Sequence, residues 1–323
     1  MKAAILKKQE KIENFPLKVE EVEIPEPGNG KALVKIEASG VCHSDLHIIE
    51  GDLPLPESMF PLIPGHEIVG TLEEPYGDFQ KGDRVGIGWF ASACGHCDQC
   101  VSGHENLCSN SKVTGMDVKG GYAQYTLVDG EYMTRIPDNI GSAEAAPLFC
   151  AGLTAFTAVK KLNFSPGERI AVYGVGGLGY YAIQFIEKMG GKAVAITGNH
   201  AQLAESVGAS EVLDRPNGKY DGSIVFAPSS SIVPVAAEHT RNGGTVVIPA
   251  IMDKVEIPFG SFAWEKNITS VASGFRPHTR ELLNFVSING ISNKITKKPL
   301  SEVNSVLKDL KNGKVNGRVV LTP

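Results

Sequence analysis

The chain has 323 residues, 42% of them hydrophobic and 21% charged, and a formal net charge of −5 at pH 7. This length predicts about two domains with cores of their own, and the absence of a long basic run argues against nucleic acid as a partner. No apolar run is long enough to span a membrane and the N-terminal residues lack the apolar core of a signal peptide, so we expect a cytoplasmic protein with reduced thiols.

The first half of the chain has an all-β pattern with long loops. Between residues 1 and 150, short apolar runs alternate with Gly, Pro and Asp, which are typical of turns between strands. Strands are predicted over residues 31–40, 67–74, 82–90 and 122–130.

Four of the six cysteines follow in one stretch with the spacing C-x2-C-x2-C-x7-C: Cys94, Cys97, Cys100 and Cys108. Four thiolates at this spacing converge readily on one tetrahedral zinc ion, and Gly95 and Gly103 give the loop its backbone freedom. An iron–sulfur cluster and unligated cysteines are the alternatives, although bacterial ferredoxin spacing differs and a redox pair needs only two thiols. Since four protein ligands leave no open position, we predict a structural zinc site.

A second pattern begins near Gly152, where helices and strands alternate. This alternation predicts a parallel, doubly wound α/β sheet. Helices are predicted over residues 152–162, 180–189, 232–242, 279–289 and 300–313. Strands are predicted over residues 170–173, 192–197, 220–228, 243–250 and 317–323.

A glycine-rich turn joins the first strand of this second pattern to the helix that follows, and its glycines are Gly174, Gly176, Gly177 and Gly179. Between a strand and a helix, such glycines let the backbone turn tightly and approach a pyrophosphate, which binds at the helix N-terminus. The motif predicts a dinucleotide cofactor. The alternative is a turn that only packs the helix against the strand.

The residues after the second strand bear on the choice between NAD and NADP, because an Asp or Glu there binds the adenosine ribose hydroxyls and favours NAD. This chain has Thr197, Gly198, Asn199 and His200 at that point. No acid is present to repel a 2′-phosphate, and Asn199 or His200 could donate a hydrogen bond to one, but no Arg or Lys lies nearby in the sequence. We favour NADP(H) over NAD(H) and keep both open.

These segments together resemble the zinc-dependent alcohol dehydrogenases of the medium-chain dehydrogenase/reductase family over essentially the whole chain. The resemblance is carried by the motifs GVCHSDLH, PLIPGHEIVG, GDRVG, CGHCDQCVSGHENLC, GGYAQY, CAGLTAF and YGVGGLG. It implies a GroES-like, β-rich catalytic domain over residues 1–151, a Rossmann dinucleotide-binding domain over 152–272, and a C-terminal segment, 273–323, that returns to the catalytic domain. The substrate is expected in the cleft between the domains.

The resemblance also implies a catalytic zinc ion held by Cys42, His66 and Cys150, with Glu67 as the neighbouring carboxylate and an open fourth position. With the four-cysteine site, this gives two zinc ions per chain. An open zinc ion polarises an alcohol oxygen and lowers its pKa. Spacing alone does not pair these ligands, which are far apart in the sequence, and a buried core cysteine and a turn histidine are the alternatives.

Removal of the hydroxyl proton from such a site needs a relay. Ser44 could accept the proton, and a nicotinamide ribose hydroxyl would pass it on to His47, whose pKa range suits proton transfer. Both residues could instead stabilise a turn. The resemblance further implies that His43 lies beside the cofactor phosphates, that Thr154 contacts the nicotinamide and that Arg318 reaches the pyrophosphate.

The expected substrate is a small primary or secondary alcohol, or the matching aldehyde or ketone. Trp89 matches a position that lines the family's substrate pocket, and Ile49 and Leu53 contribute to the pocket or pack in the core. Polyol dehydrogenases usually carry a carboxylate in place of the third thiolate, zinc-free quinone or enone reductases lack the three ligands, and an inactive cofactor-binding protein would lose part of the site. We expect a homo-oligomer, either a dimer or a tetramer.

Overall fold

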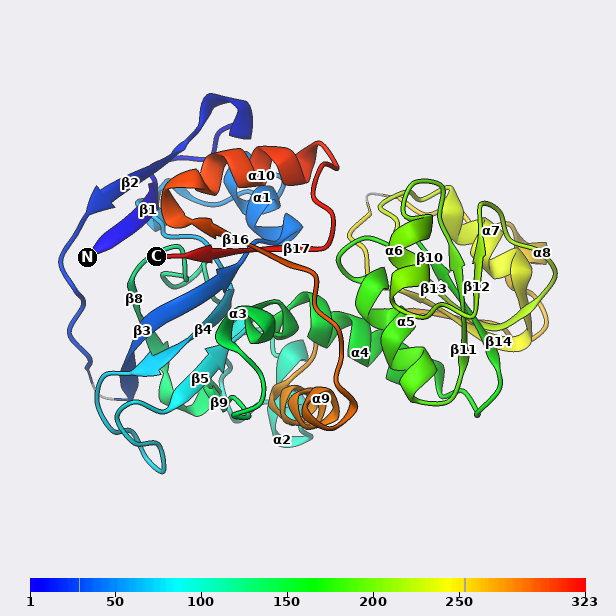
Figure 1. The fold of residues 1–323 in the computed structure, drawn as a ribbon, viewed down its shortest axis with the longest axis horizontal. Helices are drawn as coiled ribbons and strands as arrows, with labels where there is room; N and C mark the ends of the chain where they lie inside the picture. The colour runs from blue at the N-terminus through cyan, green and yellow to red at the C-terminus, as the bar shows by residue number, and fades with distance from the viewer. Residues whose placement is uncertain (29, 253) are drawn as a thin grey trace. The chain divides into compact units, whose positions relative to one another are not determined.

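The structure, a computed structural model, describes residues 1–28, 30–252 and 254–323. It contains two compact units. Unit 1 comprises Met1–Cys150, Phe275–Ser287 and Asn293–Pro323, and unit 2 comprises Ala151–Gly274 and Ile288–Ser292. In Figure 1 the first and last parts of the chain, blue and red, belong to unit 1, and the green and yellow sheet belongs to unit 2.

Unit 1 is built on a seven-stranded sheet of order β16-β17-β3-β4-β5-β9, in which β8 also pairs with β3. These strands are β3 (Lys31–Gly40), β4 (Glu67–Leu72), β5 (Arg84–Ile87), β8 (Tyr125–Asp129), β9 (Thr134–Arg135), β16 (Ile295–Pro299) and β17 (Arg318–Thr322). Two small antiparallel sheets pair β1 (Lys2–Leu6) with β2 (Leu17–Glu21) and β6 (Phe90–Ser92) with β7 (Lys112–Val113). Apolar and polar residues alternate along much of β3, so one face of that strand is buried.

Unit 1 also contains helices, so the prediction of an all-β pattern for residues 1–150 is wrong in part. Its α-helices are α1 (His43–Glu50), α2 (Asp98–Val101), α3 (Ser142–Ala145), α9 (Arg276–Asn289), which ends in unit 2, and α10 (Val303–Lys311). Short 3-10 turns are η1 (Ile12–Asn14), η2 (Glu57–Met59), η3 (Glu105–Leu107), η4 (Gly130–Tyr132), η5 (Ala146–Phe149) and η6 (Leu300–Glu302). Cys42 is the N-cap residue of α1, and its N–H donates to Asp45 Oδ2.

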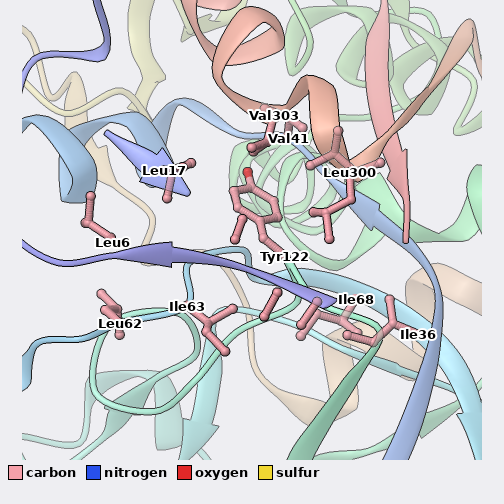
Figure 2. Close-up of a cluster of buried hydrophobic side chains, with 14 of the residues drawn as sticks. Leu6, Leu17, Ile36, Val41, Leu62, Ile63, Ile68, Tyr122, Leu300 and Val303 are labelled. Atoms are coloured by element: carbon pink, nitrogen blue, oxygen red, sulfur yellow. The ribbon is translucent and has the colours of Figure 1, made fainter. Parts of the chain in front are cut away.

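The core of unit 1 is a cluster of buried aliphatic side chains around Tyr122 (Figure 2). The cluster joins β1, β3 and β4 to Leu300 and Val303 from the C-terminal part of the chain. Each fully buried aliphatic side chain stabilises the fold by about 1.5–3 kcal/mol. This packing holds the ends of β3 and β4, where the candidate site lies.

Unit 2 is a parallel six-stranded sheet of order β12-β11-β10-β13-β14-β15. Its strands are β10 (Arg169–Tyr173), β11 (Lys192–Ile196), β12 (Glu211–Leu213), β13 (Tyr220–Val225), β14 (Thr240–Ile248) and β15 (Asn267–Ser270). Its helices are α4 (Ala151–Leu162), α5 (Gly179–Lys188), α6 (Ala201–Ser206), α7 (Ile232–His239) and α8 (Phe259–Phe262). The prediction of a doubly wound sheet is confirmed, with the strand order reversing between β10 and β13.

In three places the structure differs from the predicted elements by more than a shift of their bounds. The predicted helix over 232–242 stops at His239, because Thr240 begins β14 and its hydroxyl donates to Ala236 O at 2.7 Å. The predicted strand over 82–90 is two strands, β5 and β6, in separate sheets. The predicted helix over 300–313 starts as the turn η6 before α10 begins.

The described residues include no single helix that is long and apolar enough to cross a membrane. The segments Ser142–Phe149 and Ala151–Leu162 meet the criteria of length and composition only when they are taken together.

Candidate active site

Four potential metal ligands lie buried together in unit 1. Cys42, His66, Glu67 and Cys150 offer ligand atoms that all lie within 4.8 Å of one another. Cys42 precedes α1, His66 and Glu67 lie at the start of β4, and Cys150 follows η5. Three segments that are remote in sequence therefore bring together the residues that spacing alone does not pair.

Asp45 fixes the orientation of His66. Its Oδ1 lies 2.7 Å from His66 Nδ1, and its Oδ2 accepts hydrogen bonds from the Tyr122 hydroxyl at 2.8 Å and from Cys42 N at 3.1 Å. An ionised carboxylate only accepts, so His66 Nδ1 carries a hydrogen, and in the neutral imidazole that binds a metal the lone pair is on Nε2. His66 Nε2 is buried and has no hydrogen-bond partner among the described residues.

The charges of the cluster are strongly coupled. The hydrogen bond with Cys150, whose Sγ lies 3.9 Å from Cys42 Sγ, holds the pKa of Cys42 well below its usual value. The same contact and burial raise the pKa of Cys150. Burial acts to lower the pKa of His66, but the charge and hydrogen bond of Asp45 raise that pKa well above its usual value. The cluster thus favours the thiolate form of Cys42, which is the form that binds a metal ion.

Glu67 is paired with Arg318 in the interior. Arg318 Nη2 donates to both carboxylate oxygens of Glu67 at 2.6 Å, and both side chains are at most 5% exposed. Burial raises the pKa of Glu67 to about 7, although Arg318 acts to lower it. A Cβ atom at Gly40 would lie 1.9 Å from Glu67 Oε2, so glycine is needed there. The predicted contact of Arg318 with a cofactor pyrophosphate stays a prediction.

These residues fit a zinc ion. Two sulfurs and an imidazole nitrogen are ligands that zinc prefers, and three protein ligands leave a position for another molecule. The observation that carries the fit is His66 Nε2, a buried ring nitrogen without a hydrogen-bond partner among the described residues, which lies beside two sulfur atoms. Of the four residues in the cluster, Glu67 is already paired with Arg318. The ion would therefore be held by Cys42, His66 and Cys150.

The second cluster is the four-cysteine loop: ligand atoms of Cys94, Cys97, Cys100 and Cys108 also lie within 4.8 Å of one another. Backbone N–H groups of His96 and Cys97 lower the pKa of Cys94 to about 6, which favours the thiolate. Gly95 and Gly103 both have φ near +80°, a conformation that glycine adopts without strain. The loop is tied to α9, because Arg276 Nε donates to Glu105 Oε2 at 2.9 Å.

The two residues predicted for proton transfer lie three positions apart on α1, so they share one face of that helix. Ser44 is half-buried, and the His47 side chain is 35% exposed with its Nδ1 2.8 Å from Asp52 Oδ2. His43, which precedes Ser44, is exposed. Proton exchange with water is therefore open to His47.

The three predicted pocket residues occupy different environments. Trp89 is partly exposed, and its ring lies edge-on to the His66 ring with centroids 4.8 Å apart. Leu53 is partly exposed and packs on the core cluster, whereas Ile49 is completely buried in that cluster. Of the three, Trp89 thus contacts a candidate metal ligand, His66.

The glycine turn has the geometry that the motif predicts. Gly174 has φ of +91°, and a Cβ atom at Gly179 would lie 2.1 Å from Gly174 O, so both positions require glycine. Gly176 is exposed, Gly177 is half-buried, and a Cβ atom at Gly176 would meet nothing within 4 Å. Helix α5 starts at Gly179, and the N–H groups of Tyr180 and Tyr181 donate to Gly176 O and Leu178 O of the turn, each at 3.0 Å. Thr154, in α4, is buried.

The turn after β11 contains the residues considered for the adenosine end of the cofactor. Gly198 and Asn199 are exposed, and the Thr197 hydroxyl accepts a hydrogen bond from His200 N at 3.3 Å. Thr197 N donates to Leu213 O, so Asp214 and Arg215, which follow β12, come next to this turn. Asp214 and Arg215 carry opposite charges and are both exposed.

Sequence reasoning missed Asp45 and Tyr122, although both stand in quoted motifs, GVCHSDLH and GGYAQY. An acid three residues after Cys42, at the start of a helix, was a signal for Asp45. Nothing local in the sequence connects Tyr122 to His66.

Comparison with known proteins agrees with these features. Residues 28–138 match the family model described as the alcohol dehydrogenase GroES-like domain. An alcohol dehydrogenase from Geobacillus stearothermophilus is 39% identical over 99% of both chains, and one from Moraxella sp. is 35% identical over the same share.

Solved structures give the same picture. The alcohol dehydrogenase from the archaeon Aeropyrum pernix is similar with a TM-score of 0.88 and 29% identity, over 100% of both chains. The acetophenone reductase from Geotrichum candidum, solved in complex with NAD, also has a TM-score of 0.88 and 29% identity, over 100% of this chain and 97% of that chain.

Proposed function

We propose a zinc-dependent hydride transfer between a primary or secondary alcohol and NADP(H) as the reaction of this chain, which belongs to the alcohol dehydrogenases of the medium-chain dehydrogenase/reductase family. The single observation that carries the zinc dependence is the buried, partnerless Nε2 of His66 beside the sulfur atoms of Cys42 and Cys150. When bound there, zinc would act as a Lewis acid that lowers the pKa of the substrate hydroxyl.

The protein's own residues prepare this site. Asp45 holds the imidazole of His66 in the tautomer that leaves Nε2 free to bind a metal. Burial of all the ligands strengthens their electrostatic interactions, because the local dielectric constant is low. The indole ring of Trp89 beside His66 provides an apolar wall, which favours alcohols with an apolar body.

The proton would leave through α1. Ser44 would take the hydroxyl proton at its Oγ and release its own proton, by way of the ribose hydroxyl of the bound cofactor, to His47. His47 is partly exposed and would deliver a proton to water. Nδ1 of His47 is hydrogen-bonded to Asp52, so Nε2 of His47 is the nitrogen that would exchange protons.

Replacing Ser44 tests this path. We expect Ser44→Ala to lower kcat about 100-fold while KM for the cofactor stays within twofold, because general acid–base groups contribute roughly 10²–10⁴-fold. Ser44→Thr keeps a hydroxyl and is the matched control, expected to retain most of the activity. A rate for Ser44→Ala within twofold of the wild-type rate would remove Ser44 from the mechanism.

The glycine turn and the N-terminus of α5 would bind the cofactor pyrophosphate. At the adenosine end, Gly198 and Asn199 carry no negative charge, and Arg215 offers a positive charge beside Asp214. The turn after β11 itself carries no acid that would repel a 2′-phosphate, so NADP(H) is the proposed cofactor. The homo-oligomer and the cytoplasmic location stay predictions.

A spectrophotometric panel of alcohols, aldehydes and ketones with both nicotinamide cofactors tests the function. We expect turnover of small apolar substrates and kcat/KM at least about tenfold higher with NADP(H), as one charge-assisted hydrogen bond would give. Zinc analysis of the same sample should give two ions per chain. Higher kcat/KM with NAD(H) would overturn only the cofactor preference, whereas zinc-loaded protein without turnover on the whole panel would overturn the function.

A further inference from the structure

Tyr122 stands in the GGYAQY motif, to which the proposed function assigns no role. Its side chain is completely buried, and Figure 2 shows its ring among aliphatic side chains of the core. A phenylalanine ring would fill this space equally well, and burying a hydroxyl is unfavourable unless it makes a hydrogen bond. Packing therefore explains the ring of Tyr122 but not its hydroxyl.

The hydroxyl leads to the metal cluster in two steps. It donates to Asp45 Oδ2 at 2.8 Å, and Asp45 Oδ1 lies 2.7 Å from His66 Nδ1. All three side chains are completely buried, so neither hydrogen bond competes with hydrogen bonds to bulk water. Burial and the charge of Asp45 raise the pKa of Tyr122, so the phenol remains a donor.

Tyr122 also holds the main chain that carries His66. Its N–H donates to Pro64 O at 3.0 Å, and its ring lies against Gly65, where a Cβ atom would be 2.6 Å from the ring. Gly65 immediately precedes His66. One residue thus positions both the backbone and, through Asp45, the imidazole of a candidate ligand.

We propose that Tyr122 is a positioning residue of the metal cluster: its hydroxyl holds Asp45 so that Asp45 keeps His66 oriented toward the ion. This inference rests on the proposed function in one respect, that Cys42, His66 and Cys150 bind zinc. Without the hydroxyl, Asp45 loses one of three hydrogen bonds and His66 loses its fixed orientation, so the ion should dissociate faster.

The test is Tyr122→Phe in the full-length, zinc-loaded protein, with zinc release followed by a colorimetric chelator. Release should have two phases, and Cys42→Ser, which should keep only the four-cysteine zinc, assigns them. We expect Tyr122→Phe to accelerate the phase of the Cys42 cluster about tenfold, the lower end of the range for partners of ligating histidines, and to leave the other phase unchanged. With Co²⁺ in the cluster, its visible absorption bands should shift.

Two further variants complete the design. Tyr180→Phe removes another buried hydroxyl, one that donates to Ser292 O in unit 2, and should leave both release phases unchanged. Asp45→Asn should accelerate release from the Cys42 cluster more than Tyr122→Phe does. Release from that cluster within twofold of wild type, or equal acceleration of both phases, would overturn the role of Tyr122. Wild-type protein without zinc in the cluster would instead overturn the proposed function.

Discussion

Cys42→Ser is expected to lower kcat/KM by at least about 10³-fold, because it removes a ligand of an ion whose Lewis acidity contributes several kcal/mol to the reaction. Cys42 is 6% exposed and its Sγ lies 3.9 Å from Cys150 Sγ, and the other four cysteines form the second cluster, so none of them can take its place. The steady-state rate of alcohol oxidation measures the effect, and metal analysis should show one zinc ion per chain in place of two.

The same variant should stay folded and bind cofactor, since serine is close to cysteine in size and the glycine turn lies in unit 2. Circular dichroism and cofactor fluorescence check both points. Turnover like that of the wild type would show that Cys42 is not a ligand of the catalytic ion.

Cys97→Ser should act on stability instead. Structural zinc sites contribute folding free energy directly, and we expect a loss of at least about 3 kcal/mol, or a melting temperature lower by roughly 6–12 °C. Calorimetry with and without a chelator measures this: chelation should lower the melting temperature of the wild type toward that of the variant.

Cys97→Ser and Cys42→Ser are controls for each other. Cys97→Ser should keep the activity of the molecules that remain folded, and Cys42→Ser should keep the melting temperature within a few degrees. A melting temperature of Cys97→Ser equal to that of the wild type would show that the four-cysteine loop does not hold a structural ion.

The Glu67–Arg318 pair shows how much of the site depends on sheet register. Gly40 of β3 pairs with Glu67 of β4 on one side and with Val320 of β17 on the other. Arg318 lies two residues before Val320 and so projects from the same face of β17. Two strand pairings thus bring together side chains that are 251 positions apart. No sequence pattern near either residue contains that information.

The elements that sequence analysis predicted well are those whose cause is local. The strand, glycine turn and helix over β10 and α5 follow from apolar spacing and from glycines that only a tight turn requires. The four-cysteine loop gathers its ligands within one short segment, and its spacing is sufficient to propose it. The end of α7 was missed because Thr240 starts β14 through contacts with α7 and β13.

The parallel sheet, the glycine turn and the four-cysteine loop could be predicted from the amino-acid sequence, because each depends on residues close together in the chain. The support of His66 by Asp45 and Tyr122 and the pairing of Arg318 with Glu67 become visible in the folded chain alone. These contacts arise because strand pairing and core packing bury polar groups from distant segments together, and each buried polar group then needs another as its hydrogen-bond partner.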